Sequence, residues 1–106
     1  MTLPRVIDDY VRASNAHDVE SILACFSDDA AVHDEEQTRR GRTAIREWIM
    51  STIAKYKFQF KPLKAQDGEG ETVVAVEVSG TFPGSPVILD YHFIIEGDKI
   101  ASLAIS

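Results

Sequence analysis

The sequence predicts a single α+β domain over residues 1–106, with three N-terminal helices packed in a curved antiparallel β-sheet. Two observations indicate this fold class. Apolar residues recur at helical spacing through the first half of the chain, and beyond Lys55 they alternate with a period of two. Because the helices come first and the strands last, we expect a sheet that wraps the helices and leaves a cavity between the two layers.

The first predicted helix has the clearest pattern. Its apolar and semi-polar residues fall at positions 3, 6, 7, 10, 11 and 14, on one face of a helix. Thr2 can cap this helix, and Pro4 falls in the first turn, where a missing amide hydrogen costs nothing. Tyr10 lies on the buried face. Its ring is therefore expected in the core, and its hydroxyl needs a hydrogen-bond partner.

A second helix and a short strand follow. Asp18 is a good N-cap for a helix with apolar residues at 19, 22, 23 and 26, which residues 27–29 then end. In the strand that we predict from Ala30 to Asp34, residues 30, 32 and 34 share one face. An apolar strand face that ends in a carboxylate can carry a base into a pocket, while His33 takes the opposite face. Residues 35–41 are predicted to form a surface loop that frames this strand end.

The rest of the chain contains a third helix and four strands. The helix begins at Thr43, and its apolar face includes Trp48, which we interpret as a core or pocket-wall residue. Alternation then predicts a strand that begins at Tyr56 and is closed by a turn at 67–70. The remaining predicted strands, the last two joined by a tight turn at 96–98, cover residues 72–82, 87–95 and 99–105.

Composition excludes several classes of function. The formal net charge is −6, from 17 acidic and 11 basic residues, so the field of the protein repels nucleic acid and anionic lipid. The single cysteine, Cys25, excludes an internal disulfide and fits a reducing compartment. No apolar stretch approaches the roughly 18 residues of a membrane helix, so we expect a cytoplasmic protein without nucleic-acid or membrane partners. No phosphate-binding glycine loop or closely spaced histidine pair occurs, so neither a cofactor nor a metal is expected.

Three segments resemble the nuclear transport factor 2-like (NTF2-like) superfamily, and within it the ketosteroid isomerase-like and SnoaL-like polyketide cyclase branch. These segments are YVRASNAHDVESILACFSDDAAVHD, GRTAIREWI and YHFIIEGDKI. The resemblance covers nearly the whole chain. It implies the cone-shaped α+β barrel, also described as cystatin-like, which is commonly a homodimer through its sheet.

The resemblance also implies catalytic residues. Tyr10, in DDYVRAS, occupies the position of the tyrosine that hydrogen-bonds the substrate oxygen in ketosteroid isomerases, and Asp34, in AVHD, matches their general base. Glu35 replaces the proline that follows the base in that family. Tyr91 falls where the family has a protonated aspartate, with Asp90 one residue away. Since a one-residue shift reverses the face of a strand, the apolar residues on the face of Tyr91 favour Tyr91 as the inward residue.

Two classes of function remain open. The resemblance implies a cofactor-independent isomerase or cyclase that removes a proton next to a carbonyl, with epoxide hydrolysis as a third reading; the alternative is a non-catalytic ligand-binding or dimerisation module. A raised pKa of Asp34 within an apolar cavity would favour the enzyme, whereas an Asp34 carboxylate paired with Arg42 or Arg46 would favour the module. The expected ligand is small and apolar or carbonyl-containing. The expected pocket walls are Trp48, Phe58, Phe60, Val76 and Phe93.

Overall fold

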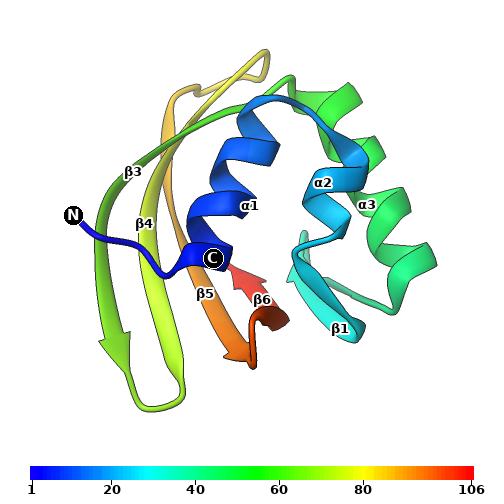
Figure 1. The fold of residues 1–106 in the computed structure, drawn as a ribbon. Coiled ribbons are helices and arrows are strands. Elements are labelled where there is room, and N and C mark those ends of the chain that lie inside the picture. Colours follow the sequence, from blue (N-terminus) through cyan, green and yellow to red (C-terminus); the bar gives the residue numbers. More distant parts are fainter.

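The computed structural model describes residues 1–106 and places three helices against one six-stranded sheet (Figure 1). This confirms the α+β class. None of the helices is both long and apolar enough to cross a lipid bilayer. The helices are α1 (Arg5–Asn15), α2 (Val19–Leu23) and α3 (Arg42–Tyr56), and the strands are β1 (Phe26–Asp34), β2 (Gln37–Arg40), β3 (Gln59–Gly68), β4 (Glu71–Ser79), β5 (Val87–Glu96) and β6 (Lys99–Ile105).

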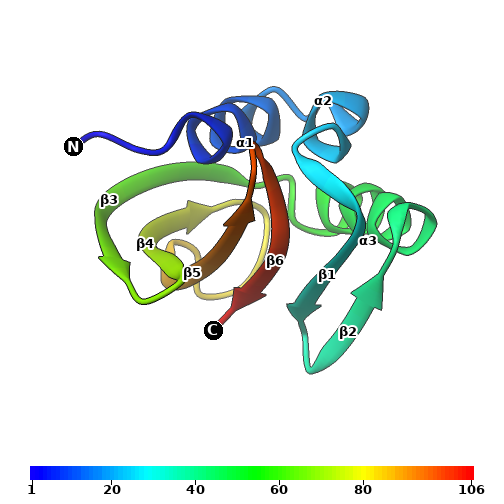
Figure 2. The ribbon, with the colours of Figure 1, turned by 60° about the horizontal axis from the view of Figure 1, so that its bottom comes forward.

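The strands lie in the order β2-β1-β6-β5-β4-β3. All neighbours are antiparallel except β1 and β6, which run parallel, so the sheet is mixed at one pair and not wholly antiparallel. In Figure 2 strands β3 to β6 curve beneath α1, whereas β1 and β2 lie beside α3. Strands β2 and β3 are free edges, so the curved sheet forms a cone without closing into a barrel.

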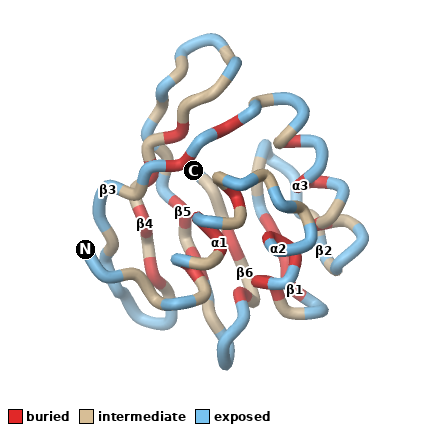
Figure 3. The backbone as a smooth tube through the Cα atoms, turned by 45° about the horizontal axis from the view of Figure 1, so that its top comes forward, coloured by how far each residue is buried: buried red, intermediate tan, exposed pale blue.

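The core fills the concave side of this sheet. On β4 the even-numbered residues from Thr72 to Val78 are buried, and the residues between them are half-buried on the convex side. In Figure 3 buried positions recur along the strands with intermediate positions between them, as period-two alternation requires. Each fully buried aliphatic or aromatic side chain in this layer stabilises the fold by about 1.5–3 kcal/mol.

The first two helices differ from the expectation at one end each. Helix α1 begins at Arg5 with Pro4 as its N-cap and no side-chain cap hydrogen bond, so Thr2 is not the cap. Helix α2 has the expected cap, because Asp18 accepts a hydrogen bond from the Ser21 amide at 3.2 Å. Phe26 belongs to β1 and not to α2. The Cys25 carbonyl accepts from the Ile100 amide at 2.8 Å, which already joins the chain to the sheet at this point.

The segment predicted to be a surface loop contains strand β2. Residues 37–40 pair with β1 in the register Ala31↔Arg40 to Asp34↔Gln37. The prediction was wrong because β2 is an edge strand whose residues are mostly exposed on both faces, so its sequence QTRR carries no hydrophobic alternation. The connection between β1 and β2 is therefore only the two residues 35 and 36.

The third helix is longer than predicted. Its last residue is Tyr56, and Lys57 is its C-cap. Lys57 adopts a left-handed conformation (φ 48°), and its amide donates to the Ile53 carbonyl. The following strand therefore begins only at Gln59. Strand β4 ends at Ser79, and Phe82 lies in the connection to β5. Gly80 passes so close to the helix end that a Cβ atom there would lie 2.2 Å from the Tyr56 carbonyl oxygen. The β4–β5 connection is thus docked on the end of α3.

Candidate functional site

A cavity of about 210 Å³ lies between the helices and the concave side of the sheet. Thirteen of its 17 lining residues are hydrophobic, which makes it an apolar pocket with a few polar groups. The interior is lined mainly by buried side chains, among them Tyr10, Ser14, Ile49, Phe58, Phe60 and Tyr91. The rim consists of less buried residues, namely Asp34, Glu35, Tyr56, Phe82, Val87, Leu89 and Ile105.

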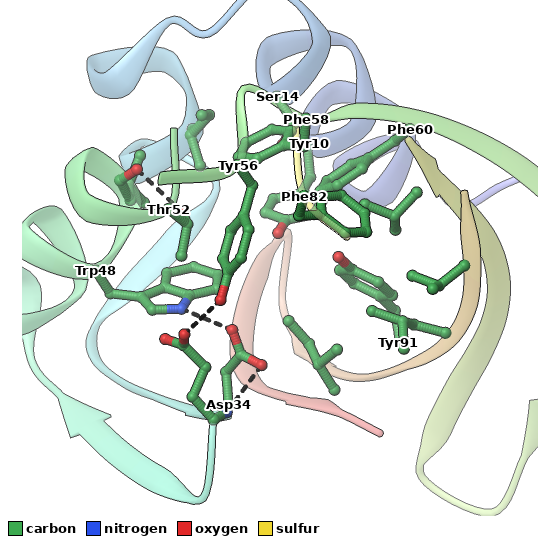
Figure 4. Close-up of a pocket in the computed structure, with 17 residues that line it drawn as sticks. Tyr10, Ser14, Asp34, Trp48, Thr52, Tyr56, Phe58, Phe60, Phe82 and Tyr91 are labelled. Carbon is green, nitrogen blue, oxygen red and sulfur yellow. Dashed lines mark hydrogen bonds between the residues drawn. The ribbon is translucent and has the colours of Figure 1, made fainter. Parts of the chain in front are cut away.

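Asp34 is the last residue of β1, and its half-buried carboxylate reaches the cavity. One oxygen, Oδ2, accepts a hydrogen bond from the Trp48 indole N–H at 3.0 Å, and Oδ1 accepts from the Glu35 amide at 2.9 Å. Figure 4 shows Asp34 and Trp48 pointing toward one another on one side of the cavity, with Tyr91 on the other. Burial raises the pKa of Asp34 and the charge of Glu35 adds to the rise, against the opposing effect of the Trp48 hydrogen bond.

No arginine side chain pairs with the Asp34 carboxylate. Arg42 lies 3.6 Å from Asp28, and Arg46 pairs with Glu20, so the two arginines that we considered as partners for Asp34 are engaged elsewhere. Arg39 donates to the main-chain oxygen of Asp34 at 2.7 Å and not to its carboxylate. The carboxylate is therefore a hydrogen-bonded group of raised pKa at the wall of an apolar cavity, the arrangement that favours the enzyme over the module.

Tyr10 and Tyr91 bring two hydroxyl groups into the same cavity from α1 and β5. Both are buried, and an aromatic cluster joins them: Phe93 lies 5.6 Å from the Tyr10 ring centroid, and Phe60 lies 5.4 Å from that of Tyr91. Burial raises the pKa of both phenols, and the charge of Asp34 raises them further. Both hydroxyls consequently stay protonated at neutral pH and can donate hydrogen bonds. Asp90 is exposed on the convex side, which confirms Tyr91 as the inward residue.

The predicted pocket walls divide into two groups. Trp48, Phe58 and Phe60 line the cavity, and the rings of Phe58 and Phe60 stack with centroids 4.6 Å apart. Val76 and Phe93 are buried in the core but do not line the cavity. Alternation places a residue on the concave face, but its depth depends on what covers it. The Tyr10 ring packs on Phe93.

The polar contacts between two rim residues, Glu35 and Tyr56, were not predicted. The sequence predicts a surface loop at Glu35 and the start of a strand at Tyr56, whereas Tyr56 is the last residue of α3. Its hydroxyl donates to Glu35 Oε2 at 2.6 Å. Lys55 Nζ donates to the same oxygen at 3.1 Å, and Arg39 donates to Oε1 at 3.3 Å. The Tyr56 hydrogen bond, followed by Lys55, lowers the pKa of Glu35. No local sequence pattern predicts these contacts, because Glu35 and Tyr56 are 21 residues apart in the chain.

Ser14 and Thr52 also line the cavity and were not predicted. A signal existed for both, since they follow Tyr10 and Trp48 by four residues and so share their helix faces. No three histidine, cysteine, aspartate or glutamate side chains converge closely enough to hold a metal ion. The polar groups that can act on a ligand are therefore one raised-pKa carboxylate, hydroxyl groups and the anionic rim residue Glu35.

The sequence matches the family model of the SnoaL-like domain over residues 7–102. Among solved structures, a candidate polyketide cyclase from Sinorhizobium meliloti is 34% identical, with a TM-score of 0.94 over 98% of this chain and 95% of that chain. The epoxide hydrolase/cyclase-like enzyme SalBIII, which acts in pyran ring formation in the polyether salinomycin, is 23% identical, with a TM-score of 0.84 over 95% of this chain and 86% of that one.

A third solved structure is a protein with a ketosteroid isomerase-like fold from Catenulispora acidiphila. It is 18% identical, with a TM-score of 0.84 over 99% of this chain and 86% of that chain. At this identity, and at that of SalBIII, the likeness concerns the fold alone. The family match and the Sinorhizobium protein extend the likeness to the sequence along nearly the whole chain.

Proposed function

The chain belongs to the SnoaL-like domain family of the NTF2-like superfamily, and from this premise we propose that it is a cofactor-independent isomerase or cyclase that removes a proton next to a carbonyl. The observation that carries the proposal is the half-buried Asp34 carboxylate, which shares an apolar cavity with the hydroxyls of Tyr10 and Tyr91. A base and two hydrogen-bond donors are what an enolate-forming reaction needs.

In the proposed mechanism Asp34 is the general base. One of its oxygens takes the proton from the carbon next to the carbonyl, and the C–H electron pair moves to give an enolate. Tyr10 and Tyr91 donate hydrogen bonds to the oxygen on which the negative charge develops. In isomerisation the enolate takes the proton back from Asp34 at another carbon. In cyclisation the enolate carbon attacks a second carbonyl carbon of the same molecule, which closes a ring, and the alkoxide that forms takes the proton from Asp34.

The magnitudes are adequate for enzymatic catalysis. A positioned base contributes about 10²–10⁴-fold, and one oxyanion donor in a dry site is worth about 3–4 kcal/mol of transition-state stabilisation. The raised pKa of Asp34 strengthens it as a base, because the protonated form is the more favourable product in this environment. The Trp48 N–H holds Oδ2 and thereby orients the carboxylate.

The cavity volume indicates a small substrate. A dry cavity of about 150 Å³ in another protein holds one benzene molecule. The 210 Å³ available here therefore suits a single ring or a short chain of roughly 8 to 12 non-hydrogen atoms. We propose a carbonyl compound of this size, with its oxygen between the two tyrosine hydroxyls and its apolar part against Phe58 and Phe60. A longer substrate has to extend past the rim.

The test is deuterium uptake next to the carbonyl for a panel of small cyclic enones and 1,3-diketones in heavy water. We expect wild-type protein to accelerate uptake and Asp34→Asn to lower the rate by about 10²–10⁴-fold with the fold intact. Asp29→Asn is the matched control, since Asp29 is an exposed acid on the same strand, and its rate should equal that of the wild type. Binding of these ketones without uptake by the wild type would assign the chain to the ligand-binding module.

We further propose that a second copy of the chain covers the convex side of the sheet. Ile88 and Ile94, 63% and 39% exposed, both point outward from β5, and the outward residues of β4 include Val73 and Ala75. In the register of the two strands Ile88 pairs with Glu77, and Val73 and Ala75 pair with His92 and Asp90, so the surface mixes apolar and charged residues. Identical surfaces of this kind can pair about a two-fold axis. Sedimentation equilibrium should give a dimer for the wild type and a monomer for Ile88→Asp, and a monomeric wild type at tens of micromolar would contradict the proposal.

A further inference from the structure

The turn between β1 and β2 is strained. Its two residues, Glu35 and Glu36, have φ angles of 55° and 61°, in the left-handed region. A two-residue hairpin turn with positive φ at both positions normally contains glycine, asparagine or aspartate. Other residues persist in this region only where the surrounding structure holds them there.

All of the side-chain contacts of the turn belong to Glu35. Its carboxylate accepts from the Tyr56 hydroxyl and from Lys55 Nζ, at 2.6 and 3.1 Å, and both donors lie at the C-terminal end of α3. On the other side it accepts from Arg39 of β2 at 3.3 Å. Glu36 is exposed and makes no side-chain hydrogen bond or ion pair. The turn is therefore fastened to α3 through one glutamate only.

The same contacts fix the position of Asp34. The Glu35 amide donates to Asp34 Oδ1, so the orientation of the peptide bond between Asp34 and Glu35 helps to set where this oxygen lies. The Arg39 guanidinium binds the Asp34 carbonyl oxygen and the Glu35 carboxylate together. A movement of the turn that rotates this peptide bond therefore shifts Oδ1, while the Trp48 indole N–H holds Oδ2.

We propose that Glu35 is a positioning residue for Asp34: its carboxylate clamps the β1–β2 turn to the end of α3 and so aims the Asp34 carboxylate into the cavity. The inference rests on the proposed function only in naming Asp34 as the base. Because Glu35 and Tyr56 both line the cavity rim, the clamp also closes one side of the opening. Figure 4 shows Tyr56 between Trp48 and Phe82 at this side.

The clamp has an electrostatic consequence for Asp34. The charged or titratable groups that face Asp34 are Glu35, Arg39 of β2, and the phenols of Tyr10 and Tyr91. Loss of Glu35 removes a negative neighbour, frees Arg39 to approach, and exposes the carboxylate to water. Each of these changes favours the ionised form and lowers the pKa of Asp34. A longer Glu35 amide hydrogen bond acts in the opposite direction, but its effect on Asp34 is smaller than that of the Glu35 charge, so the net direction is a lower pKa.

Two matched glycine variants test the clamp. Glu35→Gly and Glu36→Gly each relieve one left-handed residue and remove one negative charge, but only the first removes the clamp. The readouts are the carbon-13 titration of the Asp34 carboxyl and hydrogen exchange of the turn amides. We expect Glu35→Gly to lower the Asp34 pKa, to speed amide exchange in the turn at least tenfold, and to slow deuterium uptake by a ketone substrate about 10–100-fold. Glu36→Gly should leave all three near wild type.

Two further variants separate hydrogen bonding from charge. In Glu35→Gln the amide oxygen still accepts from Tyr56, so turn exchange should stay within about twofold of wild type while the Asp34 pKa falls. Tyr56→Phe retains the charge and should speed turn exchange. If Glu35→Gly matches Glu36→Gly in both the titration and the amide exchange, Glu35 is not a positioning residue. Because neither readout requires turnover, this outcome is distinct from a wild type that lacks uptake activity, which would instead overturn the proposed reaction.

Discussion

The β1–β2 and β5–β6 hairpins are each closed by two residues, but they reach this geometry in different ways. In β5–β6 the paired ends are Glu96 and Lys99, and Gly97 supplies the positive φ of 64°. A Cβ atom at Gly97 would meet nothing within 4 Å, so its glycine serves the backbone conformation alone. In β1–β2 two glutamates take the left-handed conformation in its place, at a cost of about 1–2 kcal/mol each.

The difference separates a turn that only reverses the chain from one that also carries a functional group. A glycine turn needs no outside support and fixes no side chain. The β1–β2 turn depends on contacts with α3 and β2, and these contacts keep the Asp34 carboxylate at the cavity wall. Strain of this kind is concentrated at functional sites, where the surrounding structure maintains it.

An intrinsically favourable turn sequence in β1–β2 should make the two hairpins alike. The double variant with Glu35→Asn and Glu36→Gly carries a sequence preferred in two-residue hairpins. We expect its free energy of unfolding to rise by about 1 kcal/mol, because relief of strain exceeds the loss of exposed ion pairs. Deuterium uptake should fall about 10–100-fold. Urea denaturation and the uptake assay check both, and full activity in this variant would show that the turn sequence does not position Asp34.

Exchange of residue types between the two turns should change stability by about 1 kcal/mol or less. Gly97→Ala should lower the free energy of unfolding by about 1 kcal/mol, through backbone strain without a steric clash. Glu36→Gly should raise it by about 0.5 kcal/mol, since glycine relieves strain but adds freedom to the unfolded chain. Thermal or urea denaturation of the two variants measures both values. If Glu36→Gly lowers the free energy of unfolding, as Gly97→Ala does, then the Glu36 backbone is not strained.

The smallest effect concerns pH, and here the two adjacent acids differ in sign. The pKa of Glu35 is lowered on folding, so its stabilising contribution is present above the ordinary glutamate range and is lost as pH falls through the folded value. Glu35→Gln should therefore lower the free energy of unfolding by about 0.2–1 kcal/mol at neutral pH and leave it unchanged in acid. The pKa of Asp34 is raised, so wild type loses stability as pH rises through that value, and Asp34→Asn should gain relative to wild type at neutral pH. Denaturation at pH 3 and pH 7 compares them.

Much of the fold followed from local patterns. Helical spacing located α1 and α3, Asp18 was the expected cap, and β6 has the predicted bounds from Lys99 to Ile105. Alternation placed Tyr91 inward, and the strand pattern placed Asp34 at the end of β1, so the sequence analysis located both residues at the cavity. These features succeed because each depends on residues within a few positions of one another.

Most features that the sequence did not predict depend on contacts between residues far apart in the chain. Edge strand β2 shows no alternation because neither of its faces packs on the core. Val76 and Phe93 have the correct face, but whether they line the cavity depends on what packs above them. The clamp joins Glu35 to Tyr56 at the far end of α3, and no spacing rule relates two such positions. The cap expected at Thr2 fails for a local reason, since Pro4, in an extended conformation, is the N-cap residue and the helix begins at Arg5.

The single parallel pair of the sheet has a consequence for the order of folding. Strand β1, which ends in Asp34, joins the rest of the sheet only through β6, and Phe26 pairs with Ile100 about 70 residues further along the chain. Closing so long a loop is slow, and β6 is the last strand to leave the ribosome. A nascent chain can form the β1–β2 hairpin early, yet the cavity has no complete wall until the final strand docks. The cavity should thus be completed in the last step of folding.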